Sequence, residues 1–201
     1  MDNHADIIWN VPNRISMARL VLSLFVFALI PIGWYWAALI VFVIAASTDW
    51  VDGWWARKFN QVSKLGRILD PFCDKILICG VFILLAEATV GSPWYLRITG
   101  WMAVVVIGRE LLVTALRGLI EQSGGDFSAK MAGKLKMWFQ CIAAGASLLA
   151  LAFKVQAPDA NTPTWLAVVL VASIWLAVLA TVYSGAEYVV AAAKYFSPKS
   201  R

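Results

Sequence analysis

The sequence has few charged residues: Asp, Glu, Lys and Arg make up 14% of its 201 residues. Soluble domains carry roughly a quarter charged residues, and about half of their residues are apolar. Here 61% of the residues are hydrophobic, so the composition argues against a soluble globular domain. The same apolar content excludes a disordered chain.

Histidine and cysteine are scarce as well. The single histidine, His4, lies in the polar N-terminal tail, and the three cysteines have no metal-ligand spacing. The sequence thus argues against a histidine metal site, a Ser-His-Asp triad and a full disulfide framework. Any bound metal is expected to be held by oxygen atoms, and any general base is expected to be a carboxylate.

Long apolar stretches predict membrane-spanning helices. Residues 20–47 contain no charge, but Pro31 and Gly33 interrupt them, so we divide this stretch between two helices. A helix needs about 20 apolar residues to cross a bilayer. The predicted spans are six, at about residues 15–31, 34–57, 76–90, 94–120, 131–153 and 164–193. We therefore expect an all-α, polytopic integral membrane protein that forms a single domain over residues 1–201.

The charges predict how the chain lies in the membrane. Residues 7–12 mix apolar and polar side chains and are expected to form an interfacial segment on the membrane surface. An even number of spans puts both termini on one side. Of the 17 lysines and arginines, only Arg97 and Lys154 fall on the other side. This bias predicts cytoplasmic termini and gives no support for a nucleic-acid partner.

Four aspartates stand out at the ends of the second and third predicted helices. Asp49 and Asp52 are three residues apart, and Asp70 and Asp74 are four apart, so each pair shares a helix face. A loop of about a dozen residues is expected between the two helices. Carboxylates that meet near the membrane interface repel one another, and divalent cations such as Mg²⁺ or Mn²⁺ would neutralise them. For a single Asp, an interfacial ion pair is an equal alternative.

Small residues accompany the first pair. Gly53 and Ala56 follow Asp52 and would leave room for a bulky phosphate ester beside the metal ions. Small residues in membrane helices also serve helix packing, which is the structural alternative.

The spacing of these residues has a known counterpart. Residues 49–57 read D-W-V-D-G-W-W-A-R, and Gly66, Asp70 and Asp74 follow. This pattern is similar to the signature D-x2-D-G-x2-A-R-x8-G-x3-D-x3-D of the CDP-alcohol phosphotransferase family, and every fixed position is present. The segments Asn10–Arg19, Gly108–Arg117 and Gly133–Lys136 resemble the bacterial phosphatidylglycerophosphate synthase branch of that family, although Ser16 and Met137 stand where threonine is usual.

The resemblance implies transfer of a phosphatidyl group from CDP-diacylglycerol to glycerol 3-phosphate, with release of CMP. It implies two metal ions held by Asp49, Asp52, Asp70 and Asp74, with Asp74 also the catalytic base. The residues expected to bind CDP-diacylglycerol are Asp52, Gly53, Ala56, Arg57 and Gly66.

The acceptor phosphate needs cations of its own. The candidates on the inner halves of the fourth and fifth helices are Arg109, Arg117, Lys134 and Lys136, since arginine and lysine both bind phosphate. Each is alternatively a positive-inside anchor, and Arg109 is alternatively an internal partner of Glu110 or of an aspartate.

Three questions stay open at this point. The same motif would serve another acceptor, namely phosphatidylglycerol, serine or inositol phosphate. A divalent-cation transporter with the four aspartates as a filter is a more distant alternative. Small residues such as Gly145 and Ala146 would pack either a second protomer, giving a homodimer, or a neighbouring helix.

Overall fold

A computed structural model describes residues 11–59, 64–123, 131–156 and 162–196. Within these ranges it describes the side chains except those of residues 11–13, 49–59, 64–71, 74, 121, 131, 132 and 134.

Six long α-helices and one short 3-10 helix build the described part of the chain, which contains no strand. They are α1 Val11–Ile32, α2 Tyr35–Phe59, α3 Lys64–Ala88, η1 Trp94–Leu96, α4 Gly100–Gln122, α5 Met131–Gln156 and α6 Thr164–Tyr195. The shortest of the six α-helices, α1, has 22 residues, which gives about 33 Å at 1.5 Å per residue. The prediction of an all-α fold is confirmed.

The turn between α1 and α2 shows why residues 20–47 form two helices. Gly33 has a positive φ of 83°, a conformation that only glycine adopts at little cost. The Gly33 amide donates to the carbonyl of Ile30, and the Trp34 amide donates to the carbonyl of Leu29. These two bonds are the Schellman arrangement that ends a helix, so the break predicted at Pro31 and Gly33 is confirmed.

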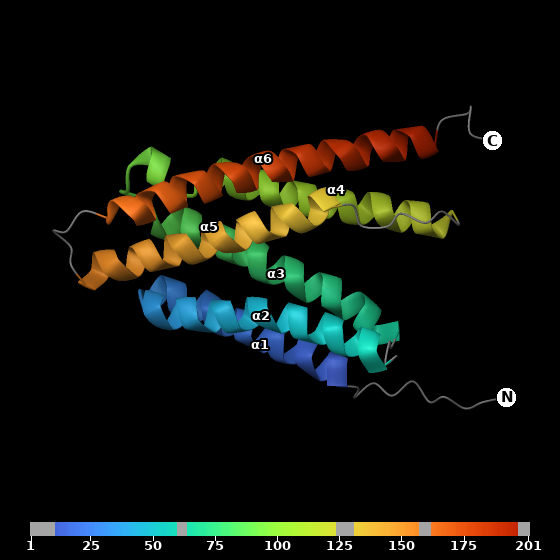
Figure 1. Cartoon of the computed structure of the whole chain (residues 1–201), viewed down its shortest axis with the longest axis horizontal. Helices are drawn as coiled ribbons and strands as arrows, with labels where there is room; N and C mark the ends of the chain where they lie inside the picture. Colours follow the sequence, from blue (N-terminus) through green and yellow to red (C-terminus); the bar gives the residue numbers. More distant parts are fainter. Residues whose placement is uncertain (1–10, 60–63, 124–130, 157–161, 197–201) are drawn as a thin grey trace.

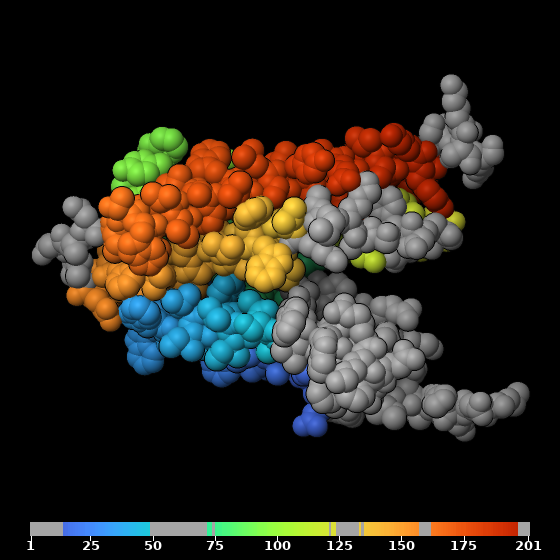
Figure 2. Space-filling view, in the orientation of Figure 1, coloured from blue at the N-terminus to red at the C-terminus, as the bar shows by residue number. Residues whose placement is uncertain are grey.

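The helices form an elongated bundle (Figure 1), in which α1, α2 and α3 make one group and α4, α5 and α6 make the other. α1 and α2 make a hairpin, and α3 packs on α1. α5 lies between α2 and α6 on the face seen in Figure 2, while α4 packs against α6 and α3. α1 begins and α6 ends at the same end of the bundle, and the α1–α2 turn and η1 lie at the other.

Side chains in the bundle are distributed as a membrane protein requires. Large apolar residues on the outside include Leu24, Ile40, Val104 and Leu179, each 58% exposed or more. Polar side chains are buried instead: Ser16, Arg19, Ser23, Thr89, Arg109, Glu110, Lys136, Gln140, Ser147, Ser173, Thr181 and Ser184. Many exposed large apolar residues, together with polar side chains buried within an apolar core, match a hydrocarbon solvent. Three helices are long and apolar enough to cross a membrane within the described residues: Arg14–Ile32, Leu135–Gln156 and Thr164–Tyr195.

Two helix starts and one loop length differ from the predictions. α3 begins at Lys64, before the predicted apolar run at 76–90 and before Asp70, because counting apolar residues misses its first three turns, which are rich in charge. Consequently only residues 60–63 separate α2 from α3, instead of a loop of a dozen residues. The fourth helix begins at Gly100 and not at residue 94, since η1 occupies Trp94–Leu96.

The predicted interfacial segment at the N-terminus covers residues 7–12. Residues 7–10 lie outside the described part of the chain, and residues 11 and 12 form the first turn of α1 rather than a separate interfacial segment.

The small residues of α5 pack inside the chain. A Cβ added to Gly145 would lie 3.9 Å from Leu39 Cδ1 on α2, and Ala146 is 8% exposed. These contacts favour the neighbouring-helix alternative for this pair over a protomer interface.

Candidate active site

The four aspartates lie on two helices that share one support. Asp49 and Asp52 belong to α2, Asp70 and Asp74 belong to α3, and both helices pack on α1. The backbone at all four positions is helical. The side chains of all four lie outside the described set, as do those of Ala56, Arg57 and Lys134 and the surroundings of Gly53 and Gly66. Among the described side chains, no three of His, Cys, Asp and Glu form a metal-binding group.

A buried arginine on α1 reaches the residue that precedes the first aspartate. Arg19 is 1% exposed, and its Nε donates to Thr48 Oγ1 at 3.2 Å. Thr48 Oγ1 in turn donates to the carbonyl of Ala45 at 2.7 Å. Sequence reasoning counted Arg19 only as one cytoplasmic charge and as the end of the N-terminal motif. The available signal was an arginine inside an apolar helix, where charge is rare unless it is functional.

Two predicted phosphate ligands meet around one carboxylate. Arg109 and Glu110 lie on α4 and Lys136 on α5, and all three are 9% exposed or less. Lys136 Nζ donates to Glu110 Oε1, and Arg109 Nη1 lies 3.4 Å from the same oxygen. We call these three residues the buried cation cluster. With two cations and one carboxylate, the cluster has a surplus positive charge.

The buried cation cluster retains unused hydrogen-bond capacity. Arg109 Nε is buried and has no hydrogen-bond partner within the described residues. Glu110 accepts both hydrogen bonds at Oε1. Lys136 uses one of its three N–H donors in this contact, so two donors stay unused. A buried group with spare donors and excess positive charge is suited to an anion with several oxygen acceptors.

Helix α6 provides the remaining contacts of Arg109. Its Nη2 donates to Ser184 Oγ at 2.5 Å, and its guanidinium carbon lies 5.4 Å from the centre of the Tyr188 ring. A Cβ added to Gly185 would lie 3.2 Å from Arg109 Cγ, so the absent side chain makes room for the arginine stem. Sequence reasoning missed these three residues, which lie far along the chain from Arg109 and belong to no charged motif.

A hydrogen-bonded chain connects the third helix to the buried cation cluster. Lys75, the neighbour of Asp74, donates from Nζ to Thr114 Oγ1 at 2.6 Å. Thr114 Oγ1 also donates to the backbone carbonyl of Glu110 at 2.6 Å. The turn of α3 that carries Asp74 is therefore joined to the turn of α4 that carries Glu110.

The structure distinguishes among the four candidate phosphate ligands. Arg109 and Lys136 are buried and brought together, so neither is an exposed positive-inside anchor. The alternative of an internal contact between Arg109 and Glu110 is confirmed, although Lys136 is the main partner of the carboxylate. Arg117 is exposed on α4, and Lys134 lies on α5 with its side chain outside the described set.

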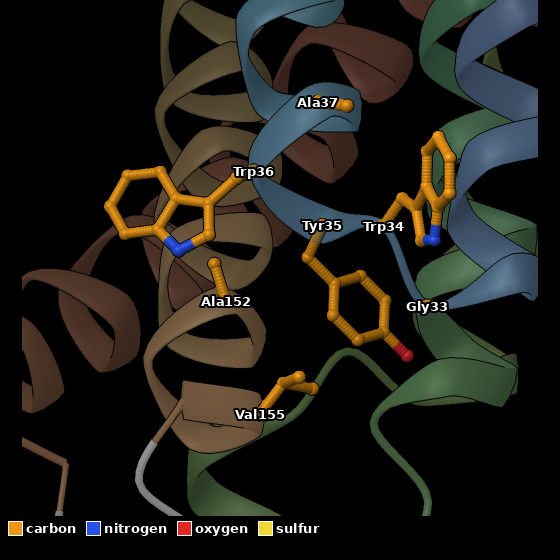
Figure 3. Close-up of a pocket in the computed structure, with 7 residues that line it drawn as sticks. All are labelled: Gly33, Trp34, Tyr35, Trp36, Ala37, Ala152 and Val155. Atoms are coloured by element: carbon orange, nitrogen blue, oxygen red, sulfur yellow. The ribbon is translucent and has the colours of Figure 1, made fainter.

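A separate pocket lies at the α1–α2 turn, at the end of the bundle away from the start of α1 (Figure 3). Its volume is about 220 Å³, and it is lined by Gly33, Trp34, Tyr35, Trp36, Ala37, Ala152 and Val155. None of these side chains carries a charge, so the pocket offers no ionic group for binding a phosphate or a metal ion.

The fold and the buried charges define a helical membrane protein with an acidic motif beside an internal cation cluster. Residues 9–183 match the family described as CDP-alcohol phosphatidyltransferase. The chain belongs to the CDP-alcohol phosphatidyltransferase family, a family of transferases.

Curated relatives extend over almost the whole chain. A Bacillus subtilis protein named CDP-diacylglycerol–glycerol-3-phosphate 3-phosphatidyltransferase is 36% identical and aligns over 90% of this chain and 93% of its own. An Escherichia coli protein of the same name is 30% identical, over 92% of this chain and 95% of its own.

A solved structure shares the fold. Phosphatidylinositol phosphate synthase from Mycobacterium tuberculosis, crystallised with CDP-DAG bound, has a TM-score of 0.63 and 21% sequence identity. The similarity covers 95% of this chain and 89% of that one, so the helical arrangement is that of the solved enzyme.

Proposed function

We propose that this protein transfers the phosphatidyl group of CDP-diacylglycerol to glycerol 3-phosphate, forming phosphatidylglycerophosphate and CMP. The names of relatives that are 30% and 36% identical over at least 90% of the chain support this reaction. The observation that carries the choice of a phosphorylated acceptor is the buried cation cluster. A phosphorylated acceptor needs cations of its own, and the cluster supplies two of them next to the motif region.

The four aspartates fit a divalent-metal site. Their oxygen donors are the ligands that Mg²⁺ and Mn²⁺ prefer, and residues three or four positions apart on a helix are neighbours that can share a ligand. We assign Asp49, Asp52, Asp70 and Asp74 to hold two such ions. When bound, the ions neutralise the diphosphate of CDP-diacylglycerol and the charge that develops on the leaving CMP.

The remaining chemistry belongs to the protein's own side chains. Asp74 accepts the proton of the acceptor hydroxyl as that oxygen forms a bond to the phosphorus of the phosphatidyl group. The bond from this phosphorus to the CMP oxygen breaks, and CMP leaves with the electron pair. Gly53, Ala56, Arg57 and Gly66, together with Asp52, border the CDP group and orient it.

The phosphate of the acceptor binds at the buried cation cluster. Arg109 presents a planar fork of donors and Lys136 a point charge, while Lys134 and Arg117 extend the positive surface along the same helices. The hydrogen bonds from Lys75 to Thr114 and from Thr114 to the Glu110 carbonyl fix the position of this phosphate site relative to the turn of α3 that carries Asp74.

The reaction also accounts for the position of the site in the membrane. Lipid tails stay in the hydrocarbon while the headgroup reaches the interface. We infer six membrane spans, with both termini and the active site on the cytoplasmic face of a bacterial inner membrane. The support is that Arg97 and Lys154 alone, among 17 lysines and arginines, fall at the opposite ends of the predicted spans.

Product identification tests the proposal. The purified full chain is incubated in mixed micelles with CDP-diacylglycerol, Mg²⁺ and, in turn, glycerol 3-phosphate, inositol 1-phosphate, serine or phosphatidylglycerol. We expect CMP and phosphatidylglycerophosphate only in the first reaction. A product with another acceptor and none with glycerol 3-phosphate would overturn the acceptor assignment. Divalent-ion flux in liposomes without CMP release would overturn the assignment as a transferase.

A further inference from the structure

Arg109 is held mainly by groups outside its own helix. Arg109 and Glu110 are consecutive residues of α4, so their side chains point in different directions. Here a single nitrogen of Arg109 approaches Glu110, at 3.4 Å, whereas the bond from Nη2 to Ser184 measures 2.5 Å. The Glu110 carboxylate is occupied instead by Lys136. The shortest contact of the guanidinium is therefore with α6, and its contact with Glu110 is the longer one.

Two further features of α6 act in the same direction. Tyr188 lies one helical turn after Ser184, so both face the same side of α6, and its ring lies 5.4 Å from the guanidinium carbon, within the range of a cation–π contact. Gly185, between them, leaves the space that the Arg109 stem occupies. In Arg109, Nη1 thus contacts Glu110, Nη2 contacts Ser184 and the guanidinium lies over the Tyr188 ring. Its Nε is buried and has no hydrogen-bond partner within the described residues.

We propose that Ser184, Gly185 and Tyr188 are positioning residues that fix the guanidinium of Arg109 and direct it to the phosphate of the acceptor. The inference rests on the proposed function, because it assumes that Arg109 binds that phosphate. It assigns α6, which carries no residue of the family motif, a role in acceptor affinity. CDP-diacylglycerol binding does not depend on these three residues.

The test compares two α6 variants with matched controls. Ser184→Ala removes the hydroxyl that holds Nη2, and Gly185→Ala places a methyl group 3.2 Å from Arg109 Cγ. Ser173→Ala is the control for the first, since Ser173 is buried on the same helix and donates only to the carbonyl of Leu170. Gly118→Ala is the control for the second, because an added Cβ there meets nothing within 4 Å.

Steady-state kinetics with purified full-length protein give the result. We expect Ser184→Ala and Gly185→Ala to raise the KM for glycerol 3-phosphate about tenfold, the typical effect of one hydrogen bond to a charged group. The kcat and the KM for CDP-diacylglycerol should stay within about twofold, as should every constant of the controls. In Gly185→Ala the helix propensity of alanine offsets part of the cost of the 3.2 Å contact with the flexible Arg109 stem, and Ser184→Ala tests the proposal independently.

Arg109→Ala distinguishes a failure of the phosphate-site assignment from a failure of the positioning role of α6. If it leaves the KM for glycerol 3-phosphate unchanged, the assignment of the phosphate site fails, and the positioning role fails with it. If Arg109→Ala raises that KM while Ser184→Ala and Gly185→Ala do not, the proposed function stands and the role of α6 is overturned. If the two α6 variants lower kcat and leave the KM for glycerol 3-phosphate unchanged, that result also contradicts the positioning role.

Discussion

Lys136→Met removes one of the two cations from the buried cation cluster with little change in side-chain volume. Lys136 is 7% exposed and donates to Glu110, so its ammonium is desolvated and close to Arg109. A hydrogen bond to a charged group contributes about 1.5–3 kcal/mol. At 1.4 kcal/mol per factor of ten, the KM for glycerol 3-phosphate should rise roughly 10- to 100-fold.

The same substitution should lower stability for a separate reason. It leaves the buried Glu110 carboxylate with only the 3.4 Å contact to Arg109. Breaking a buried ion pair costs about 3–5 kcal/mol, and the remaining arginine should keep the loss near or below the lower limit. The double variant Lys136→Met/Glu110→Gln has the same net cluster charge as the parent and should regain most of the thermal stability. Its KM for glycerol 3-phosphate should nevertheless stay raised, because the ammonium is still absent.

The assay measures both KM values together with the thermal unfolding midpoint in detergent. Lys154→Met is the matched control, since Lys154 lies in the last turn of the same helix, at the other end of the bundle, and should leave both KM values unchanged. An unaltered KM for glycerol 3-phosphate in Lys136→Met would refute the assignment of the cluster to the acceptor phosphate. An equal rise in the KM for CDP-diacylglycerol would refute it as well.

Three further predictions concern the base, the metal ions and the packing. Asp74→Asn should keep CDP-diacylglycerol binding but reduce kcat by about 10²- to 10⁴-fold, the usual contribution of a general base; a near-normal rate in a CMP-release assay would exclude Asp74 from that role. Treatment with EDTA should stop CMP release, and added Mg²⁺ or Mn²⁺ should restore it; full activity in excess chelator would contradict a metal requirement. Gly80→Ala should lower the free energy of unfolding by about 1–3 kcal/mol through overpacking, because its Cβ would lie 2.3 Å from Phe27 Cζ. Adding Phe27→Leu should recover most of this loss in a thermal melt, and equal melts for Gly80→Ala and its parent would show that α1 and α3 do not pack as described.

The parts of the fold that follow from local rules could be predicted from the sequence. Apolar length indicated the membrane class, and Pro31 with Gly33 marked the first turn, because a positive φ at glycine is a local property of the chain. The start of α3 was predicted wrongly, since a helix that emerges from the bilayer continues through charged residues as readily as through apolar ones.

In the candidate site as well, features set by local spacing could be predicted from the sequence, and features set by helix packing could not. The four aspartates were recognised because they lie close together in sequence at helical spacings. The environment of Arg109 depends on which helices pack together, and Ser184 is 75 residues away from it. Serine, glycine and tyrosine in an apolar helix carry no spacing signal of their own, so only the packing of α6 on α4 reveals their contacts with Arg109. Arg19 was visible as a charge in an apolar helix, but its contact with Thr48 was not.

The account depends above all on the assignment of divalent ions to the four aspartates of α2 and α3. Calorimetric titration of the purified chain with Mn²⁺ in the presence of CDP-diacylglycerol measures this directly. The account predicts two ions bound per chain, and loss of at least one of them, together with metal-dependent CDP-diacylglycerol binding, in Asp49→Ala. No bound ion in the parent protein, or the same two ions in Asp49→Ala, would contradict it.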